Sequence, residues 1–128
     1  LMEGAWQVSL ESSGIGTYPV SWPSRAEAAN GQTSPEELLA AAHSTCFSMA
    51  LSHGLAQAGT PPTTIDTTAD VTFQPGTGIT GIVLKVVGDV PGITAEQFQT
   101  AAEAAKAGCP VSQALAAVPI TLEATFAG

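Results

Sequence analysis

The chain contains the stretch Ser34-Pro-Glu-Glu-Leu-Leu-Ala-Ala-Ala-His-Ser-Thr-Cys-Phe-Ser-Met-Ala-Leu51, which predicts one long helix. Ser34 is a favourable N-cap, Pro35 suits the first helical position, and Glu37 completes a capping box three residues after the serine. We expect the helix to run from 35 to about 58, before a glycine and two prolines. It is apolar on nearly every face, so we expect it to lie in the middle of a domain or an oligomer. A monomer of this size would struggle to cover it on all sides, so we predict a dimer.

Shorter elements are predicted on both sides of this helix, mainly from alternating apolar and polar residues. Before it, we expect strands at 5–10 and 17–22 and a loop at 24–33. After it, we expect a strand hairpin at 64–73 and 79–88, helices at 95–107 and 110–117, and a closing strand at 119–126. A second capping box, Thr94 with Gln97, opens the helix at 95–107. The order β-β-α-β-β-α-α-β predicts one α+β domain over residues 1–128, with a long buried central helix flanked by an antiparallel sheet.

Composition limits the possible partners. The 128 residues are 45% apolar and carry a net charge of −8, from 11 acids against Arg25, Lys85 and Lys106. So few cations argue against nucleic acid and against an anionic membrane surface as partners. We find no apolar run long enough for a transmembrane helix and no visible signal peptide. Two cysteines are too few for a secreted disulfide scaffold, so we expect a cytoplasmic protein with reduced thiols.

The two cysteines are the most informative chemical groups. Cys46 lies within the long helix, and Cys109 lies 63 positions later, where one predicted helix ends and another begins. Such a pair has three common interpretations, which are a structural disulfide, a redox couple and two unrelated core thiols. The spacing alone leaves all three open.

Cys46 needs a cation to become reactive. A thiolate is the nucleophilic form, and burial in an apolar helix disfavours it. Arg25 is the best candidate, because the two lysines lie on predicted exposed faces. Glu36, ten residues before Cys46, could hold the arginine along the helix. Alternatively, Cys46 is a packed small apolar residue, Arg25 is solvated, and Glu36 only complements the helix dipole.

Cys109 has a different local environment. It is the expected N-cap of the helix that Pro110 opens, where backbone N–H groups favour a thiolate. Local electrostatics therefore predict that Cys109 is the more acidic thiol. The alternative is that it simply caps a helix junction.

Metal and cofactor sites are less favoured. His43, His53, Cys46 and Cys109 could supply four zinc ligands, but zinc motifs usually pair their ligands closely on turns, and no C-x-x-C is present. No glycine-rich phosphate loop, no G-x-S-x-G and no paired catalytic carboxylates are visible. We therefore predict neither a metal nor an organic cofactor.

The two cysteine segments resemble the motifs of the OsmC (osmotically inducible protein C) family of thiol peroxidases. The 34–51 stretch is similar to the family's first-cysteine helix, and Ala107-Gly-Cys-Pro-Val-Ser-Gln-Ala-Leu115 to its second-cysteine motif. Ile65-Asp-Thr-Thr-Ala-Asp-Val71 and Val90-Pro-Gly-Ile93 match between them. The likeness runs from about residue 5 to 126 and favours the OsmC branch over the organic hydroperoxide resistance (Ohr) branch. Family members begin with a further strand, so we expect the chain to be short at its N-terminus.

The resemblance implies an intertwined α+β homodimer and a role for four residues. Cys46 would be the peroxidatic thiol, Cys109 the resolving thiol, Arg25 the activating arginine and Glu36 the glutamate that orients it. Cys46 would attack an organic hydroperoxide to give a sulfenic acid, and Cys109 would condense with it to form a disulfide. An external, dihydrolipoamide-like dithiol would then reduce the disulfide, with no cofactor.

The resemblance and the local electrostatics differ on which thiol attacks. We follow the resemblance, because an arginine carried on a loop can reverse the desolvation of Cys46. The apolar residues around it, Leu39, Phe47 and Met49, favour organic hydroperoxides over hydrogen peroxide. The alternative function is a non-enzymatic module that binds a small ligand or senses redox state, with the cysteines as a static or regulatory disulfide.

Overall fold

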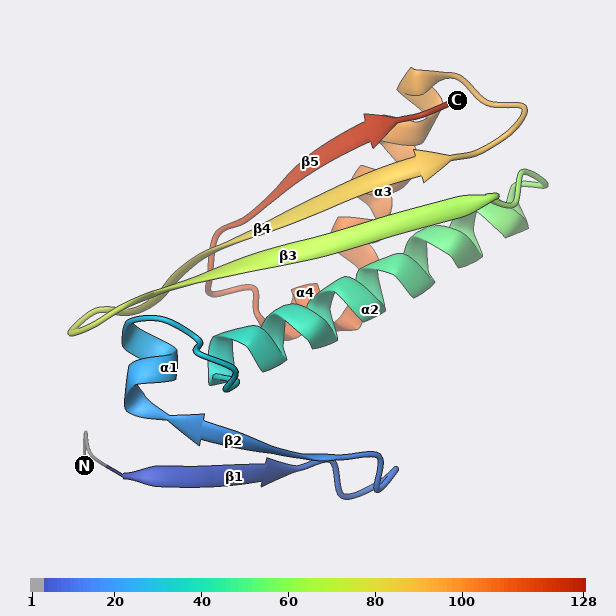
Figure 1. Ribbon diagram of the computed structural model, residues 1–128. Helices are drawn as coiled ribbons and strands as arrows, with labels where there is room; N and C mark the ends of the chain where they lie inside the picture. The colour runs from blue at the N-terminus through green and yellow to red at the C-terminus, as the bar shows by residue number, and fades with distance from the viewer. Residues whose placement is uncertain (1–3) are drawn as a thin grey trace.

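The computed structural model describes residues 4–128, which form a two-stranded hairpin, a three-stranded sheet and four helices (Figure 1). The α+β class is confirmed. The elements are β1 (Ala5–Ser9), β2 (Thr17–Ser21), α1 (Trp22–Ala26), α2 (Pro35–Gln57), β3 (Thr64–Gln74), β4 (Gly78–Asp89), α3 (Ala95–Gly108), α4 (Pro110–Ala114) and β5 (Ile120–Phe126).

The short helix α1 is an addition to the predicted order, because the loop expected at 24–33 begins with helix. The hydroxyls of Ser21 and Ser24 each accept a hydrogen bond from the other's backbone N–H, at 3.3 and 3.1 Å. This is a capping box, and Pro23 sits in the first turn, where it disrupts no helical hydrogen bond. A single turn is too short to show helical periodicity in the sequence, which is why the prediction was wrong there.

The sheet has the order β3-β4-β5 and is mixed. Strands β3 and β4 form the predicted antiparallel hairpin, with Val71 opposite Ile82. Strand β5 runs parallel to β4, with Ile82 opposite Ile120, so the prediction of an antiparallel sheet is wrong for β5. The physical reason is the connection, since α3 and α4 carry the chain back to the start of β4 before β5 begins.

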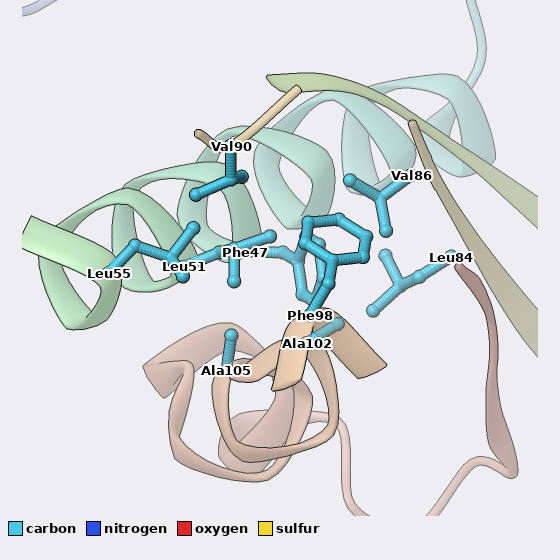
Figure 2. Packing of buried hydrophobic residues seen from close by; sticks show 9 residues of the cluster. All are labelled: Phe47, Leu51, Leu55, Leu84, Val86, Val90, Phe98, Ala102 and Ala105. Carbon is cyan, nitrogen blue, oxygen red and sulfur yellow. The ribbon is translucent and has the colours of Figure 1, made fainter. Parts of the chain in front are cut away.

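Helices α2 and α3 cover one face of the sheet and form the core with it (Figure 2). The aromatic ring of Phe98 lies at its centre, where it meets Phe126 at 5.6 Å between ring centroids. Gly88 makes this possible, because a β-carbon there would overlap the Phe98 ring. The buried side chains of the cluster come from α2, from β4 and the residue after it, and from α3; they are Phe47, Leu51, Leu55, Leu84, Val86, Val90, Phe98, Ala102 and Ala105.

Helix α2 begins as predicted but uses only half of the expected capping box. The Ser34 hydroxyl accepts a hydrogen bond from the Glu37 N–H at 3.1 Å. The Glu37 carboxylate instead accepts one from the Thr33 hydroxyl. The helix buries one stripe against the sheet, whereas Met49 on another face is 68% exposed. The apolar surface predicted on nearly every face is therefore only partly covered within the chain.

The β1–β2 hairpin lies apart from the three-stranded sheet (Figure 1). Register places Trp6, Val8, Tyr18 and Val20 on one of its faces. Trp6 is 49% exposed and Tyr18 41%, so this apolar face is not covered by the rest of the described chain. A hairpin of two strands is marginally stable alone and gains stability by packing against another surface. Within residues 4–128, no helix is both long and apolar enough to cross a membrane.

Candidate active site

The fold brings the two cysteines together. Cys46 lies in the middle of α2, and Cys109 is at once the C-cap of α3 and the N-cap of α4, which packs against α2 (Figure 1). Their thiols are close enough to interact directly, and both are free. The 63-residue separation is therefore bridged by the packing of α4 on α2.

The two thiols differ in access to solvent. Cys46 is half-buried, whereas the side chain of Cys109 has no exposed surface. A small molecule that approaches the pair from outside therefore meets Cys46 first.

The pKa of the Cys46 thiol is raised above its ordinary value. Burial is the largest cause, and the neighbouring Cys109 acts in the same direction through a side-chain interaction and charge. The backbone N–H of Val111 acts in the opposite direction but is weaker. Within one chain, Cys46 therefore lacks the group that would make it a thiolate at neutral pH.

The pKa of the Cys109 thiol is lowered. Burial is the largest single influence and would raise it. The Cys46 thiol, the hydroxyl and backbone N–H of Ser112, and the backbone N–H of Val111 together outweigh burial. These N–H groups belong to the start of α4, although the Cys109 sulfur makes no capping hydrogen bond of regular geometry. Cys109 is the more acidic thiol, as its helix-end position predicts.

Arg25 and Glu36 form the second cluster of the site. The Nη2 atom of Arg25 lies 3.1 Å from Oε2 of Glu36, and its Nε donates to both carboxylate oxygens at 3.2 Å. The guanidinium carbon also lies 4.2 Å from the ring centroid of Phe73, a cation–π contact. Trp22 packs edge-on against the same ring and fixes α1 on the end of β3. Because Glu36 is almost fully buried, the arginine is held in one orientation.

The Arg25–Glu36 cluster borders a cleft but lies far from Cys46 of the same chain. The cleft has a volume of about 360 Å³ and is also lined by Ala40 and Phe73. Glu36 and Cys46 are ten residues apart on α2, which corresponds to about 15 Å along a helix axis. Within one chain, the structure pairs Cys46 with Cys109 and Arg25 with Glu36, but it does not bring the two pairs together.

Two buried polar residues lie on the helices that carry the cysteines; the sequence indicated His43 only as a possible zinc ligand and did not single out Ser112. His43, one turn before Cys46, has its Nε2 atom 2.7 Å from Oγ of Ser112, one turn after Cys109. Both side chains are buried, and burial lowers the pKa of the His43 imidazole. Sequence spacing offered a signal, because each residue lies three positions from a cysteine and thus on the same side of its helix.

The structure does not assemble the zinc ligands considered above. Among residues 4–128, no three histidine, cysteine or acidic side chains converge in a way that could hold a metal ion. His43 is bonded to Ser112, and His53 lies on an exposed part of α2.

Comparison with known proteins identifies the family of the chain. Residues 28–123 match the family described as OsmC-like protein. The chain is 49% identical over 126 residues to the peroxiredoxin OsmC of Escherichia coli (strain K12), covering 96% of this chain and 87% of that protein. The peroxiredoxin OsmC of Shigella flexneri shows the same identity and coverage.

Solved structures show the same architecture. An organic hydroperoxide resistance protein from Elizabethkingia anophelis has a TM-score of 0.69 at 25% identity, covering 96% of this chain and 94% of that one. An OsmC-like protein of unknown function from Vibrio cholerae has a TM-score of 0.75 at 18% identity, covering 94% and 83%. The latter supports the fold alone.

An α+β fold that places an accessible thiol beside a buried, more acidic one defines a class of two-cysteine redox proteins. Within that class, the chain belongs to the OsmC-like protein family.

Proposed function

We propose that the protein is a cysteine-based peroxidase that reduces organic hydroperoxides through Cys46 and Cys109. The observation that carries this proposal is the half-buried Cys46 beside the fully buried Cys109. A relative that is 49% identical is named a peroxiredoxin, and structural neighbours are named organic hydroperoxide resistance proteins. The cytoplasmic location expected from the cysteine content belongs to the same proposal.

The proposed catalytic cycle uses the two thiols in turn. The Cys46 sulfur attacks the peroxide, the O–O bond breaks, and the alcohol leaves with a proton. Cys46 has then lost two electrons and is a sulfenic acid. The Cys109 sulfur attacks the Cys46 sulfur and expels hydroxide, which takes up a proton to become water. An external dithiol returns two electrons and restores both thiols.

Arg25 is proposed to act on the Cys46 of a second copy of the chain. Its own Cys46 lies about 15 Å along the helix from Glu36, which anchors the guanidinium. The hairpin leaves an apolar face with Trp6 and Tyr18 uncovered, and α2 exposes Met49. A homodimer would cover these surfaces and could carry the Arg25–Glu36 pair of one subunit to the Cys46 of the other. The arginine would then favour the thiolate and donate hydrogen bonds to the peroxide.

A dimer is therefore expected in solution. Light scattering coupled to size-exclusion chromatography should give twice the chain mass of 12.8 kDa at micromolar concentration. The charge-introducing variant Tyr18→Glu should shift the mass toward that of the monomer, because it places a carboxylate on the uncovered hairpin face. Ser9→Glu, on the opposite face of the hairpin, is the matched control and should stay dimeric. A monomeric wild type would contradict the dimer.

Replacing Arg25 by methionine should slow the first oxidation of Cys46 by about a hundredfold, because the thiolate and the transition state each lose a charged donor. The rate is measured by stopped-flow fluorescence after mixing with cumene hydroperoxide. Lys85→Met is the matched control, since Lys85 pairs with Asp70 at 3.1 Å on the outer face of the sheet. Equal rates in the two variants would contradict the role of Arg25.

The test of the overall function is multiple turnover. Wild-type protein should consume many equivalents of cumene hydroperoxide per chain in the presence of dihydrolipoamide, with a larger kcat/KM than for hydrogen peroxide. The preference rests on Met49, which is exposed on α2, whereas Phe47, also expected from the sequence to favour organic substrates, is buried in the core. Consumption of a single equivalent by folded protein would instead favour a redox sensor, and none would favour a ligand-binding module.

A further inference from the structure

A buried hydrogen bond between His43 and Ser112 joins the two segments that carry the cysteines, α2 and the start of α4. The Nε2 and Oγ atoms are 2.7 Å apart, His43 is fully buried, and Ser112 is nearly so. Buried polar groups cost free energy unless each is hydrogen-bonded. The Nδ1 atom of His43 has no partner among the described residues. An apolar pair would fill this contact between α2 and α4 without that cost, so the polar pair calls for a chemical explanation.

The unpartnered nitrogen indicates which way the hydrogen bond runs. Burial lowers the pKa of His43, so its imidazole is neutral and carries one hydrogen. A hydrogen on Nδ1 would leave a buried donor unpaired, whereas a hydrogen on Nε2 is donated to Oγ of Ser112. The second arrangement leaves the hydroxyl hydrogen of Ser112 free to point elsewhere. We assign this tautomer on that basis.

Ser112 lies three residues after Cys109, at the third position of α4, and its hydroxyl is among the groups that lower the pKa of the Cys109 thiol. Among residues 4–128, no charged side chain is among the groups that shift the pKa of Cys109. Lys106, in the last turn of α3, lies 3.4 Å from Oε2 of Glu103 and donates to the Ile120 carbonyl at 3.5 Å. Of the titratable groups on α2, Cys46 interacts with Cys109 directly, whereas His43 is bonded to Ser112. The donors available to Cys109 are thus a thiol, the Ser112 hydroxyl and backbone N–H groups.

We propose that His43 and Ser112 are positioning residues for the resolving thiol, with His43 Nε2–H donating to Ser112 and Ser112 O–H donating to the Cys109 sulfur. The pair holds Cys109 as the anion that attacks the sulfenic acid. It acts again in the reductive half of the cycle, where a dithiol that attacks the Cys46 sulfur expels Cys109 as a thiolate. Leaving-group thiols of lower pKa depart faster, so the same donors assist both steps.

The chemical step is balanced. Cys109 loses its proton to solvent when the thiolate forms, and the S–S bond forms as the S–O bond of Cys46 breaks. The departing hydroxide takes up one proton, so condensation yields one disulfide and one water with no net proton released. The two electrons were removed earlier by the hydroperoxide. This inference rests on the proposed roles of the two cysteines.

The first test measures Cys109 without any peroxide. In a Cys46→Ser background, thiolate absorbance at about 240 nm is followed as a function of pH. Ser112→Ala and His43→Leu should each move the titration to higher pH, because the thiolate loses a donor. His43→Gln should stay close to the parent, because its amide nitrogen can donate to Ser112 as Nε2 does. Ser48→Ala is the control, since that hydroxyl bonds Thr67 at 2.8 Å on another side of α2.

The second test follows resolution in chains with both cysteines. After one equivalent of cumene hydroperoxide, dimedone trapping reports the lifetime of the Cys46 sulfenic acid. Ser112→Ala and His43→Leu should oxidise at the parent rate but keep the sulfenic acid about tenfold longer, as the loss of one hydrogen bond to a charged group implies. His43→Gln and Ser48→Ala should resolve at the parent rate.

The outcomes separate this inference from the proposed function. If His43→Leu and His43→Gln give the same Cys109 titration and the same sulfenic acid lifetime, the proposed role of His43 and Ser112 is wrong. This comparison remains decisive even if Ser112→Ala does not fold. A shift of Ser48→Ala as large as that of Ser112→Ala would also overturn it, because the effect would then be one of packing. Failure of the wild type to turn over would instead reject the peroxidase, leaving the titration of Cys109 interpretable.

Discussion

Replacing Cys46 by serine is expected to abolish catalytic reduction of organic hydroperoxides. A hydroxyl is a far weaker nucleophile than a thiolate, and loss of the nucleophile in covalent enzymes costs about 10⁴-fold or more in kcat. Cys109 cannot replace Cys46 as the nucleophile, because its side chain has no exposed surface that a peroxide could reach. The measurement is peroxide consumption with cumene hydroperoxide and dihydrolipoamide, at enzyme concentrations high enough to detect a residual rate.

Cys109→Ser is the matched variant for this experiment. It should react once with peroxide at a rate close to that of the wild type and then stall as a sulfenic acid, which mass spectrometry detects as a dimedone adduct. The two variants therefore differ in the first oxidation, although neither turns over. If Cys109→Ser instead blocks the first oxidation and Cys46→Ser does not, the roles of the two cysteines are reversed.

The largest effect on stability is expected for Phe98→Ala. The ring of Phe98 is fully buried between α3 and β4 (Figure 2). It also contacts the ring of Phe126. Removing it creates a cavity that Gly88, which has no side chain, cannot fill. Such a change costs about 3–5 kcal/mol, a large part of the roughly 5–15 kcal/mol that stabilises a typical domain. Urea unfolding followed by circular dichroism would measure the free energy of unfolding.

Gln99→Ala is the control for Phe98→Ala. Gln99 follows Phe98 on α3 but lies exposed, where its amide donates to Glu103 at 3.3 Å. Substitutions at such surface positions usually change the free energy of unfolding by less than about 0.5 kcal/mol. A loss in Phe98→Ala no greater than in Gln99→Ala would show that the cluster around Phe98 is not the main core. Both measurements need the same protein concentration, because dimer formation also contributes to stability.

Local sequence was sufficient for the elements that have strong end signals. Ser34 and Thr94 cap α2 and α3 at the predicted positions, and the Thr94–Gln97 capping box is complete. The β3–β4 hairpin follows from alternation of apolar residues around the turn at Gly76. These features depend on residues that lie close together in the sequence, so the sequence alone predicts them.

Long-range features needed the fold. Strand β5 pairs parallel to β4 because α3 and α4 bring the chain back to the start of β4. The residues of β5 alone do not indicate the direction of the strand beside it. The bond between His43 and Ser112 joins residues 69 positions apart, so its existence depends on α4 packing against α2. The spacing of His43 from Cys46 and of Ser112 from Cys109 indicated that each pair shares one side of its helix. It did not predict the contact between His43 and Ser112.

The candidate site also combines features predicted from the sequence with features that only the tertiary structure decides. The residues themselves identified Cys46, Cys109, Arg25 and Glu36 as candidates, and the end of a helix predicted which thiol is more acidic. Packing decided which thiol is accessible, because solvent exposure is a property of what surrounds a side chain rather than of its neighbours in sequence. It also anchored Arg25 on Glu36, which lies about 15 Å along the α2 axis from Cys46 of the same chain.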